Sequence, residues 1–491
     1  AGDSIESHIR DTLSGGCGIA GENAVRGLCE SAPEIIAWLK KLGTVFTTEP
    51  DGSVSKRAFG GQSHKRTCYC GASTGKQIVT ALVMEARRYE GLGRIKRRLW
   101  MDFYSALIHD GVCRGAVFYN EATGQPEAIT ADSVVIATGG QNALFGKTTG
   151  STQCDGYAAG KLFMQGVALK NLEFIQYHPT TIETGQKRML ISEAVRGEGG
   201  RLYYVDEQIG SRVYFMEEKF GQRGNLMPRD VVARCMEETG KDVFLDITFL
   251  GKEKIRKKLP EVYDLCKKYR GIDISKQSIP VSPSVHFFMG GIAVKNNHET
   301  NIRNLYAIGE CASIYHGANR LGGNSLLAAI YGGKVATASI EKSESDGTDI
   351  DFSAEVREAA EKLRFLRGSQ SQYPVKYIRD MLAETMQEHL GIVRSAEKLQ
   401  MGIDDVSFYL SVADKIHYDR SELAYFGYSL SAILTLAKAT LICAQSREES
   451  RGAHFRSDYP TAKDEKKAAT IITYGNGSYQ TYLDTEGKYE N

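Results

Sequence analysis

One side chain in this sequence that could take part in chemistry is an arginine beside a glycine-rich turn. Arg320 stands in the run Asn319 to Gly323, directly before an apolar helix that begins near Asn324-Ser325-Leu326. The free N–H groups and the dipole of a helix N-terminus favour negative charge, and a nearby guanidinium adds a bidentate donor. This combination predicts the capture of a carboxylate or a phosphate.

Further charged residues lie in short segments that are ambiguous when taken singly. Glu193 and Arg196 are spaced to pair on one helical turn, and Arg229 opens a helix at about 231–238. By themselves these residues fit a solvated ion pair and a helix cap. Three histidines, 178, 286 and 316, also lie in unusual loops, but their spacing gives no metal signature. We therefore predict no metal site.

Two short apolar strands end in small residues that could approach a cofactor. Strand 133–137 runs into Thr138-Gly139-Gly140, and strand 305–309 runs into Glu310. In a doubly wound sheet, ligands bind beyond the carboxyl ends of the strands, and Glu310 could accept from ribose hydroxyls. Ordinary strand–loop junctions are the alternative. The G-x-G-x-x-G at 16–21 is rejected as a dinucleotide fingerprint because a helical pattern, not a strand, precedes it.

The composition of the chain excludes several classes of protein. The chain has 491 residues, long enough for two to four domains. With 61 basic and 60 acidic residues the net charge is +1, which predicts no nucleic-acid partner. Ten cysteines form no C-x-x-C pair, which argues against an iron–sulfur cluster on this chain and favours a reducing compartment. The apolar stretch 430–444 is too short to span a bilayer.

The periodicity of the chain predicts the elements that must position these residues. Helices are expected at 4–13, 22–42, 76–89 and 325–341, and a hairpin at 99–119 that turns at Asp110-Gly111. A polar region of helices and loops is expected at about 171–285. Long helices are expected at 353–366, 375–401 and 421–445 after a linker at 343–351, and irregular structure after Pro460.

Taken together, these segments resemble the flavoprotein subunit of succinate dehydrogenase and fumarate reductase, a family that includes L-aspartate oxidase. The motifs of the family occur in the same order over nearly the whole chain. The motifs that carry it are Phe59-Gly60-Gly61, 137–140, 173–180, 192–200, 228–230, 286–291, Gly309-Glu310, 316–321, 324–326 and 450–454.

The resemblance implies an α/β fold with a helical part. We expect a discontinuous, doubly wound FAD-binding domain at 1–171 and 286–342, and a capping domain at 172–285. A helical domain at 353–445 and a C-terminal tail at 446–491 would follow. Family members begin with a strand, a true G-x-G-x-x-G and a helix, and many carry a histidine linked covalently to flavin. We expect that opening unit, about 50 residues, to be missing from this sequence.

The resemblance also implies roles for individual residues. Arg229 would shuttle the proton, with Glu193 and Arg196 as its relay. A C4 dicarboxylate would be held by one set of side chains and FAD by another. The first set is His178, Thr180, His286 and Arg320, and the second is Thr138, Gly139, Gly140, Asp155, Glu310, Asn324, Ser325 and Leu326.

The implied activity is the interconversion of succinate and fumarate, with L-aspartate oxidation as the alternative. A flavin-free scaffold is a further alternative of another class. For the leading activity we expect an iron–sulfur protein subunit as partner and, through it, a membrane anchor. The protein would then be cytoplasmic and peripheral on the membrane.

Overall fold

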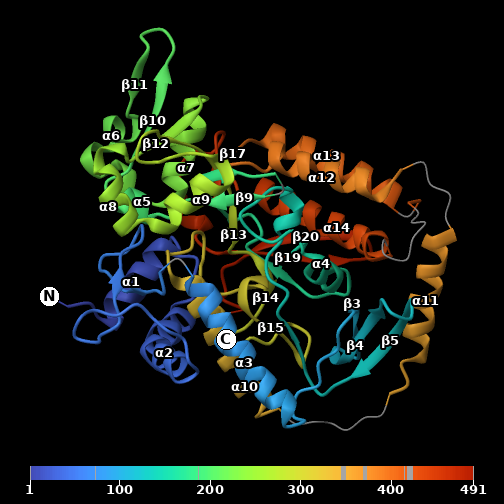
Figure 1. Cartoon of the computed structure of the whole chain (residues 1–491). Helices are drawn as coiled ribbons and strands as arrows, with labels where there is room; N and C mark the ends of the chain where they lie inside the picture. The colour runs from blue at the N-terminus through green and yellow to red at the C-terminus, as the bar shows by residue number, and fades with distance from the viewer. Residues whose placement is uncertain are drawn as a thin grey trace.

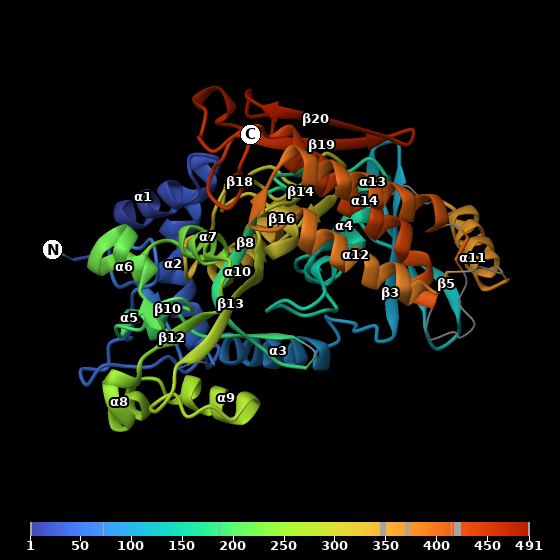
Figure 2. The same ribbon diagram turned by 90° about the horizontal axis from the view of Figure 1, so that it is seen from above.

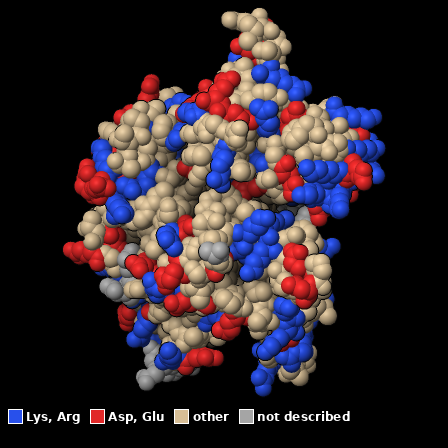
Figure 3. Space-filling view, turned by 90° about the vertical axis from the view of Figure 1, so that its left-hand side faces the viewer, with Lys and Arg blue, Asp and Glu red and all other residues tan. Residues whose placement is uncertain are grey.

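The computed structural model describes residues 2–489 apart from 72, 186, 344–349, 369–372, 414 and 417–423. In Figure 1 the green segments gather on one side of the molecule, above the blue N-terminal helices, and the orange helices lie on the other side. Acidic and basic side chains are interspersed over the face in Figure 3, as expected for a net charge of +1. Residues 344–349 of the expected linker lie outside the described residues.

The N-terminal part of the body is mainly helical. Ser4 caps the first helix by accepting a hydrogen bond from the backbone N–H of Ser7. The run 16–21 forms the turn between the first two helices, where Cys17 and Gly18 have φ of 53° and 72°. Rejection of this run as a dinucleotide fingerprint is therefore confirmed. The elements are α1 (Ile5–Gly15), α2 (Glu22–Lys41), β1 (Lys56–Arg57), β2 (Thr67–Cys68) and α3 (Thr74–Gly91).

A three-stranded antiparallel sheet and a parallel strand pair complete this part of the body. The expected hairpin is confirmed, with its turn at Asp110-Gly111. Strand β6 pairs in parallel with β15, so the segments that follow the two strands meet at one edge. The elements are β3 (Met101–His109), β4 (Val112–Asn120), β5 (Gln125–Thr130), β6 (Val134–Ile136), α4 (Tyr157–Met164), β7 (Leu169–Lys170), β14 (Gly291–Ala293), β15 (Leu305–Ala307), β16 (Ala312–Ser313) and α10 (Asn324–Ile340).

The segment 172–285 forms a cap with its own sheet, which corrects the expectation of helices and loops. Six strands pair in the order β11-β10-β12-β13-β8-β9, and an apolar cluster built from residues between Ile182 and Val281 packs among the cap's elements. Strand β13 contains Pro280 and Pro283, so its sequence does not resemble a strand, and pairing with β8 overrides that local preference. The elements are β8 (Ile175–Glu183), β9 (Arg188–Leu190), α5 (Ala194–Gly197), β10 (Arg201–Asp206), β11 (Ser211–Val213), α6 (Phe215–Phe220), α7 (Arg229–Thr239), β12 (Val243–Asp246), α8 (Gly251–Lys258), α9 (Pro260–Arg270) and β13 (Ile279–Phe288). The boundaries at 172 and 285 stay predictions.

The C-terminal helices share one apolar core with the body. The expected single helix at 375–401 is wrong, because the chain breaks near Gly391 and the buried Arg394 binds the carbonyl of that glycine. The elements are α11 (Ser353–Gly368), α12 (Val375–His389), β17 (Val393–Arg394), α13 (Ala396–Ala413) and α14 (Ala424–Ser446).

Helix α14 confirms the helix expected at 421–445, of which 421–423 lie outside the described residues, and it is longer than the apolar stretch 430–444. Among the described residues it is the one helix long and apolar enough to cross a membrane, yet 78% of its most apolar window is buried inside the protein. It packs closely on α4, because a Cβ at Gly160 would lie 2.2 Å from the carbonyl oxygen of Ala432. We therefore assign α14 to the protein core.

The expectation of irregular structure after Pro460 is wrong. Strands β19 (Ala469–Gly475) and β20 (Ser478–Asp484) form a hairpin, after the short β18 (Phe455–Arg456). The turn is Asn476-Gly477, with φ of 51° and 76°. Strand β19 pairs with β7, so the C-terminal segment extends a sheet of the body along one edge of the molecule (Figure 2).

A fully buried ion pair connects three parts of the chain behind the cap. Arg447, just after α14, donates from Nε to Oε1 of Glu173 at 2.6 Å and from Nη2 to Oγ1 of Thr470 at 2.7 Å. Its Nη1 donates to Glu449 at 2.8 Å, and both ion-paired carboxylates are 0% exposed. Removing one partner of such a pair leaves an uncompensated charge in a medium that solvates it poorly.

Arg447→Met should lower the free energy of unfolding by about 3–5 kcal/mol, because the buried Glu173 would lose its ion-pair partner, whereas Glu449 keeps Arg451 at 2.8 Å. Urea unfolding of the two proteins measures the difference. Arg88→Met is the control, since Arg88 pairs with Glu85 at the surface and should cost at most about 1 kcal/mol. Equal effects of the two substitutions would contradict a special role for the buried pair.

Candidate active site

The charged residues singled out in the sequence meet where the cap contacts the body. His178 and Thr180 come from β8, Glu193 and Arg196 from the turn at α5, and Arg229 from the first residue of α7. From β13 and the loop before α10 come His286 and Arg320. Pro228 precedes Arg229, and the fixed φ of proline suits the start of a helix. Arg229 therefore lies at the N-terminal end of α7, where it lines a cavity of about 590 Å³.

Glu193 lies between two buried arginines. Arg229 Nε donates to its Oε1 at 2.6 Å, and Arg196 Nη2 lies 3.4 Å from the same oxygen. The three side chains are at most 10% exposed. Burial alone would raise the pKa of Glu193, but the charges of Arg229 and Arg196 outweigh it and lower the pKa to about 2. The carboxylate is therefore ionised and bridges the two guanidinium groups.

Arg320 is a buried cation without an ion-paired carboxylate among the described residues. Its guanidinium lies 4.4 Å from the centroid of the Phe287 ring, and Nη2 donates to the side-chain oxygen of Gln176 at 3.0 Å. Its buried Nε has no hydrogen-bond partner within the described part of the chain. Burial, and then the charge of Arg229, lower the pKa of Arg320. An anion bound in this cavity would stabilise the charged guanidinium group against both burial and the repulsion from Arg229.

Two neutral imidazoles face each other beside the arginines. The ring centroids of His178 and His286 are 5.3 Å apart, and His286 Nδ1 lies 2.8 Å from Oγ1 of Thr149. Burial, and then the charge of Arg229, lower the pKa of both rings well below the usual value. His178 Nε2 is buried without a hydrogen-bond partner in the described residues, so it can bind a ligand atom. Thr180 is also buried, and its hydroxyl donates to the carbonyl of Ile191 at 2.9 Å.

Glu310, Asn324, Ser325 and Leu326, four of the eight residues expected to hold FAD, line two adjacent cavities of about 590 and 290 Å³. A Cβ at Gly140 would lie 2.7 Å from Oε1 of Glu310, so only glycine allows this approach. Thr138 and Gly139 precede it at the end of β6. The Glu310 carboxylate accepts from the N–H of Phe288 at 3.1 Å, and burial raises its pKa to about 7.

The N-terminus of α10 borders both cavities and offers backbone donors. Ser325 and Leu326 line each cavity, and no side chain caps this helix end. The cavities therefore fit a flat group with an oxygen acceptor near the helix N-terminus. The side chain of Asn324 is turned to α1 instead, where its Nδ2 donates to Thr12 at 3.0 Å. The backbone N–H of Asn324 donates to the carbonyl of Leu321 at 3.3 Å, so the free backbone donors of this helix end begin at Ser325.

Asp155 lies in a separate buried cluster. Its carboxylate accepts from the hydroxyl of Tyr425 at 3.0 Å and faces Arg379 at 3.5 Å, on the side of the helical part. It lines neither of the two cavities. The assignments of Asp155 and of the other site residues stay predictions.

Sequence reasoning gave no role to three polar residues that the structure places among the arginines. Gln176, Asn319 and Asp230 are connected by hydrogen bonds of 2.7 and 2.8 Å. The available signal was the position of Gln176 on an apolar strand, two residues before His178 and so on the same strand face. A glutamine that is 0% exposed must find partners inside the protein.

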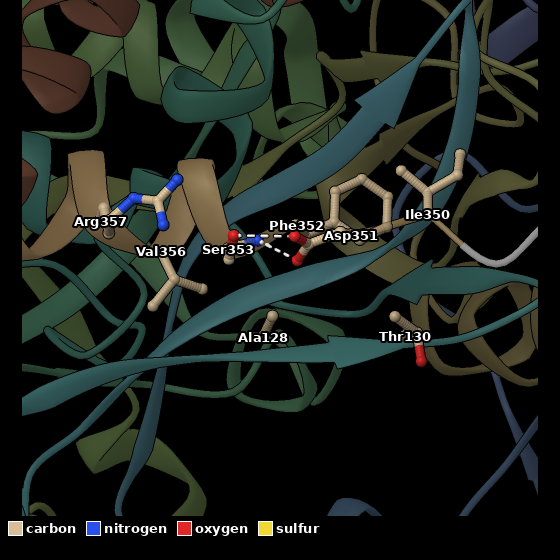
Figure 4. A pocket seen from close by; sticks show the side chains of 8 residues that line it. All are labelled: Ala128, Thr130, Ile350, Asp351, Phe352, Ser353, Val356 and Arg357. Atoms are coloured by element: carbon tan, nitrogen blue, oxygen red, sulfur yellow. Dashed lines mark hydrogen bonds between the residues drawn. The ribbon is translucent and has the colours of Figure 1, made fainter.

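A further cavity of about 690 Å³ lies away from this cluster, between β5 and the start of α11 (Figure 4). Thr130 and Arg357 line it from the two elements. Asp351 accepts hydrogen bonds from Ser353 beside it. It shares no residue with the arginine site, and we assign it no function.

The sequence and the structure match known flavoproteins. The family profile described as FAD binding domain matches residues 1–326, and that described as fumarate reductase flavoprotein C-term matches 379–487. The succinate dehydrogenase flavoprotein subunit of Bacillus subtilis is 36% identical and covers 98% of this chain and 85% of its own length. A mutant of Escherichia coli quinol fumarate reductase FrdA has a TM-score of 0.91 at 28% identity, covering 98% of this chain and 87% of that chain. Mycobacterium smegmatis Sdh1 has a TM-score of 0.84 at 27% identity, covering 98% and 84%.

His316→Gln should change how stability depends on pH. His316 is buried against the Phe287 ring, and burial, then the charge of Arg320, lower its pKa to about 3. Because its pKa is lowered, His316 stays neutral in the folded protein, whereas the same side chain in the unfolded chain takes up a proton below pH 6.5. The stability from this group is thus present above pH 6.5 and lost as pH falls toward about 3.

At pH 5 the unmodified protein should have lost about 2 kcal/mol relative to pH 7 through this residue, and the variant should not show that loss. Urea unfolding of both proteins from pH 5 to 8 gives the difference curve. A pH-independent difference would mean that His316 is not held neutral.

Proposed function

Because this chain belongs to the flavoprotein family of succinate dehydrogenases and fumarate reductases and uses FAD, we propose that it interconverts succinate and fumarate. The observation that carries the proposal is the charge of the cavity. Of three guanidinium groups in the site, Arg196 and Arg229 share one ion-paired carboxylate, Glu193, and Arg320 has none among the described residues. A dicarboxylate supplies the anionic charge that this arrangement needs.

Substrate binding divides between two sides of the cavity. Arg320 would take one carboxylate bidentately from the body, with the Phe287 ring behind its guanidinium. His178 and His286 would hold the other carboxylate, and Thr180 would join them when its hydroxyl turns from the carbonyl of Ile191 to the substrate. A neutral imidazole has one N–H group, so each ring can donate one hydrogen bond to the carboxylate, and the charge of the rings does not change near pH 7. Unequal holding of the two ends would twist the molecule and polarise the bond between its central carbons.

FAD, when bound, supplies the hydride chemistry. Thr138, Gly139, Gly140 and Glu310 would hold it at the ends of the parallel strands, together with Ser325 and Leu326 at the α10 N-terminus. The positive end of that helix would favour negative charge on the ring system. Packing of the cap on the body buries the reacting carbons and excludes water.

Arg229 would move the proton. An arginine rarely gives up a proton, so it can serve only where it is held in place and can be recharged at once. Its Nε lies 2.6 Å from Glu193, which contacts Arg196, and Arg196 donates from Nη1 to the carbonyl of Asn225 at 2.7 Å. The ionised groups Glu193 and Arg196 would act as the relay that returns a proton to Arg229 after each transfer.

The charge of the site favours succinate over L-aspartate, the alternative substrate. Aspartate would bring an ammonium group beside Arg229 and Arg320, where like charges repel. The carboxylate that pairs with Arg229, Glu193, is already engaged by two guanidinium groups. L-aspartate oxidation is therefore the second candidate.

Electrons must leave the flavin by a route outside this chain. The ten cysteines form no C-x-x-C pair, so we propose a separate iron–sulfur protein subunit as electron partner and, through it, a membrane anchor. The relatives' description as flavoprotein subunits supports this arrangement. The protein would then be cytoplasmic and peripheral on the membrane.

One assay with two substrates tests the proposed function. The purified flavoprotein should be reduced by succinate and reoxidised by fumarate through an artificial dye, while L-aspartate leaves the flavin spectrum unchanged. Rapid reduction by L-aspartate in air, with no response to succinate, would replace the proposal by the second candidate.

Arg229→Gln and Arg229→Lys should lower kcat by about 10²–10⁴-fold in both directions with little change in dicarboxylate affinity, because the shuttle acts in the chemical step. Steady-state kinetics and malonate titration measure the two effects. Arg234→Gln, also on α7, is the control, since Arg234 lies over the Phe455 ring outside the cavity. A kcat close to that of the unmodified enzyme would exclude Arg229 as the proton shuttle.

A further inference from the structure

The Gln176 side chain connects the two arginines that would face the substrate from opposite sides. Its oxygen accepts from Arg229 Nη1 at 2.9 Å and from Arg320 Nη2 at 3.0 Å. Its nitrogen donates to Oδ1 of Asn319 at 2.7 Å and to the carbonyl of Arg320 at 2.9 Å. The residue is 0% exposed and lies on β8, while Arg229 belongs to the cap and Arg320 to the body.

These four hydrogen bonds allow one orientation of the amide. A primary amide has two acceptor sites on oxygen and two hydrogens on nitrogen, and all four are used. Reversing it would point the NH₂ group at two guanidinium donors and the oxygen at two other oxygens. The position of each arginine is thereby tied to the other through one oxygen atom.

Asn319 and Asp230 hold the glutamine in that orientation. Because Oδ1 of Asn319 accepts from Gln176, its Nδ2 is the group that donates to Oδ1 of Asp230, at 2.8 Å. Asp230 follows Arg229 in α7, so the contacts close a ring: Arg229, Gln176, Asn319, Asp230 and back along the backbone. The ring joins cap, strand and body, and Figure 2 shows α7 beside β8 at the centre of the molecule.

We infer that Gln176, oriented by Asn319 and Asp230, is a positioning residue that sets the separation of Arg229 and Arg320 and fixes the cap in its catalytic position on the body. The inference deepens the proposed function and rests on it. Two like charges at the edge of one cavity repel, and without a shared acceptor each guanidinium would move to another partner. Both carboxylate binding and proton transfer would then lose their geometry.

Gln176→Met in the FAD-bound protein is the direct test. Methionine has a similar length and no acceptor or donor for these four bonds. We expect kcat for fumarate reduction to fall about 10–100-fold, as a misplacement near 1 Å can cause, and the Kd of malonate to rise about tenfold. Thr181→Val is the matched control, because Thr181 is buried on the same strand and donates only to Ser282. It should lower Tm while leaving kcat and Kd unchanged.

Gln176→Glu separates positioning from a purely structural role and serves if the methionine variant does not fold. One glutamate oxygen still accepts from both guanidinium groups, and the other, in place of the NH₂ group, accepts from Nδ2 of Asn319 once that amide turns, so kcat should stay within tenfold of the unmodified enzyme. Its negative charge competes with the substrate for the same cations, so the Kd of malonate should rise at least tenfold. A structural role alone would not produce this split between kcat and Kd.

The outcomes are distinct. A methionine variant whose kcat and malonate Kd lie within threefold of the unmodified values overturns the inference. So does a glutamate variant that loses kcat with an unchanged Kd, or that changes only Tm. If the unmodified protein neither binds malonate nor reduces fumarate, the proposed function itself has failed, and the variants are not the cause.

Discussion

Burial of positive charge at the contact of cap and body is the constraint on which this structure depends. Arg196, Arg229 and Arg320 are all removed from water, and the transfer of such a group is costly unless it is hydrogen-bonded or paired. Glu193 pairs with the first two, and the amide oxygen of Gln176 is shared by the last two. The site therefore exists only while cap, strand β8 and body stay in contact.

Strand β8 carries this constraint into the rest of the fold. Gln176 and His178 alternate along it, so their side chains lie on one face, and the register with β13 shifts between His178 and Thr181. Just before the strand, Glu173 is held by Arg447, and its backbone carbonyl accepts from Arg394 at 2.7 Å. The C-terminal segment thus anchors the start of the strand, although more than 270 residues separate it from Glu173.

Local patterns in the sequence predicted the elements but not their tertiary partners. The hairpin at Asp110-Gly111 and the helices of the body follow from period and turn chemistry, and the family motifs indicated the residues that now surround Glu193 and Arg320. The hairpin at Asn476-Gly477 carried an equally strong turn signal and was missed because the segment after Pro460 is polar on average, although its first strand contains the buried Ile471 and Ile472. Strand β13 could not be predicted, since its two prolines and its serines are overridden only by pairing with β8. The ring through Gln176 joins residues far apart in the chain, so no spacing indicates it.

The ring of hydrogen bonds through Gln176 also limits how this sequence can evolve. At position 176 an amide is needed only because position 319 offers an acceptor, and position 319 needs its own amide only because position 230 is a carboxylate. A change of donor into acceptor at one position is tolerable when its neighbour changes in the opposite sense. Positions 176, 230 and 319 should therefore vary together among related chains, although they lie in three separate segments.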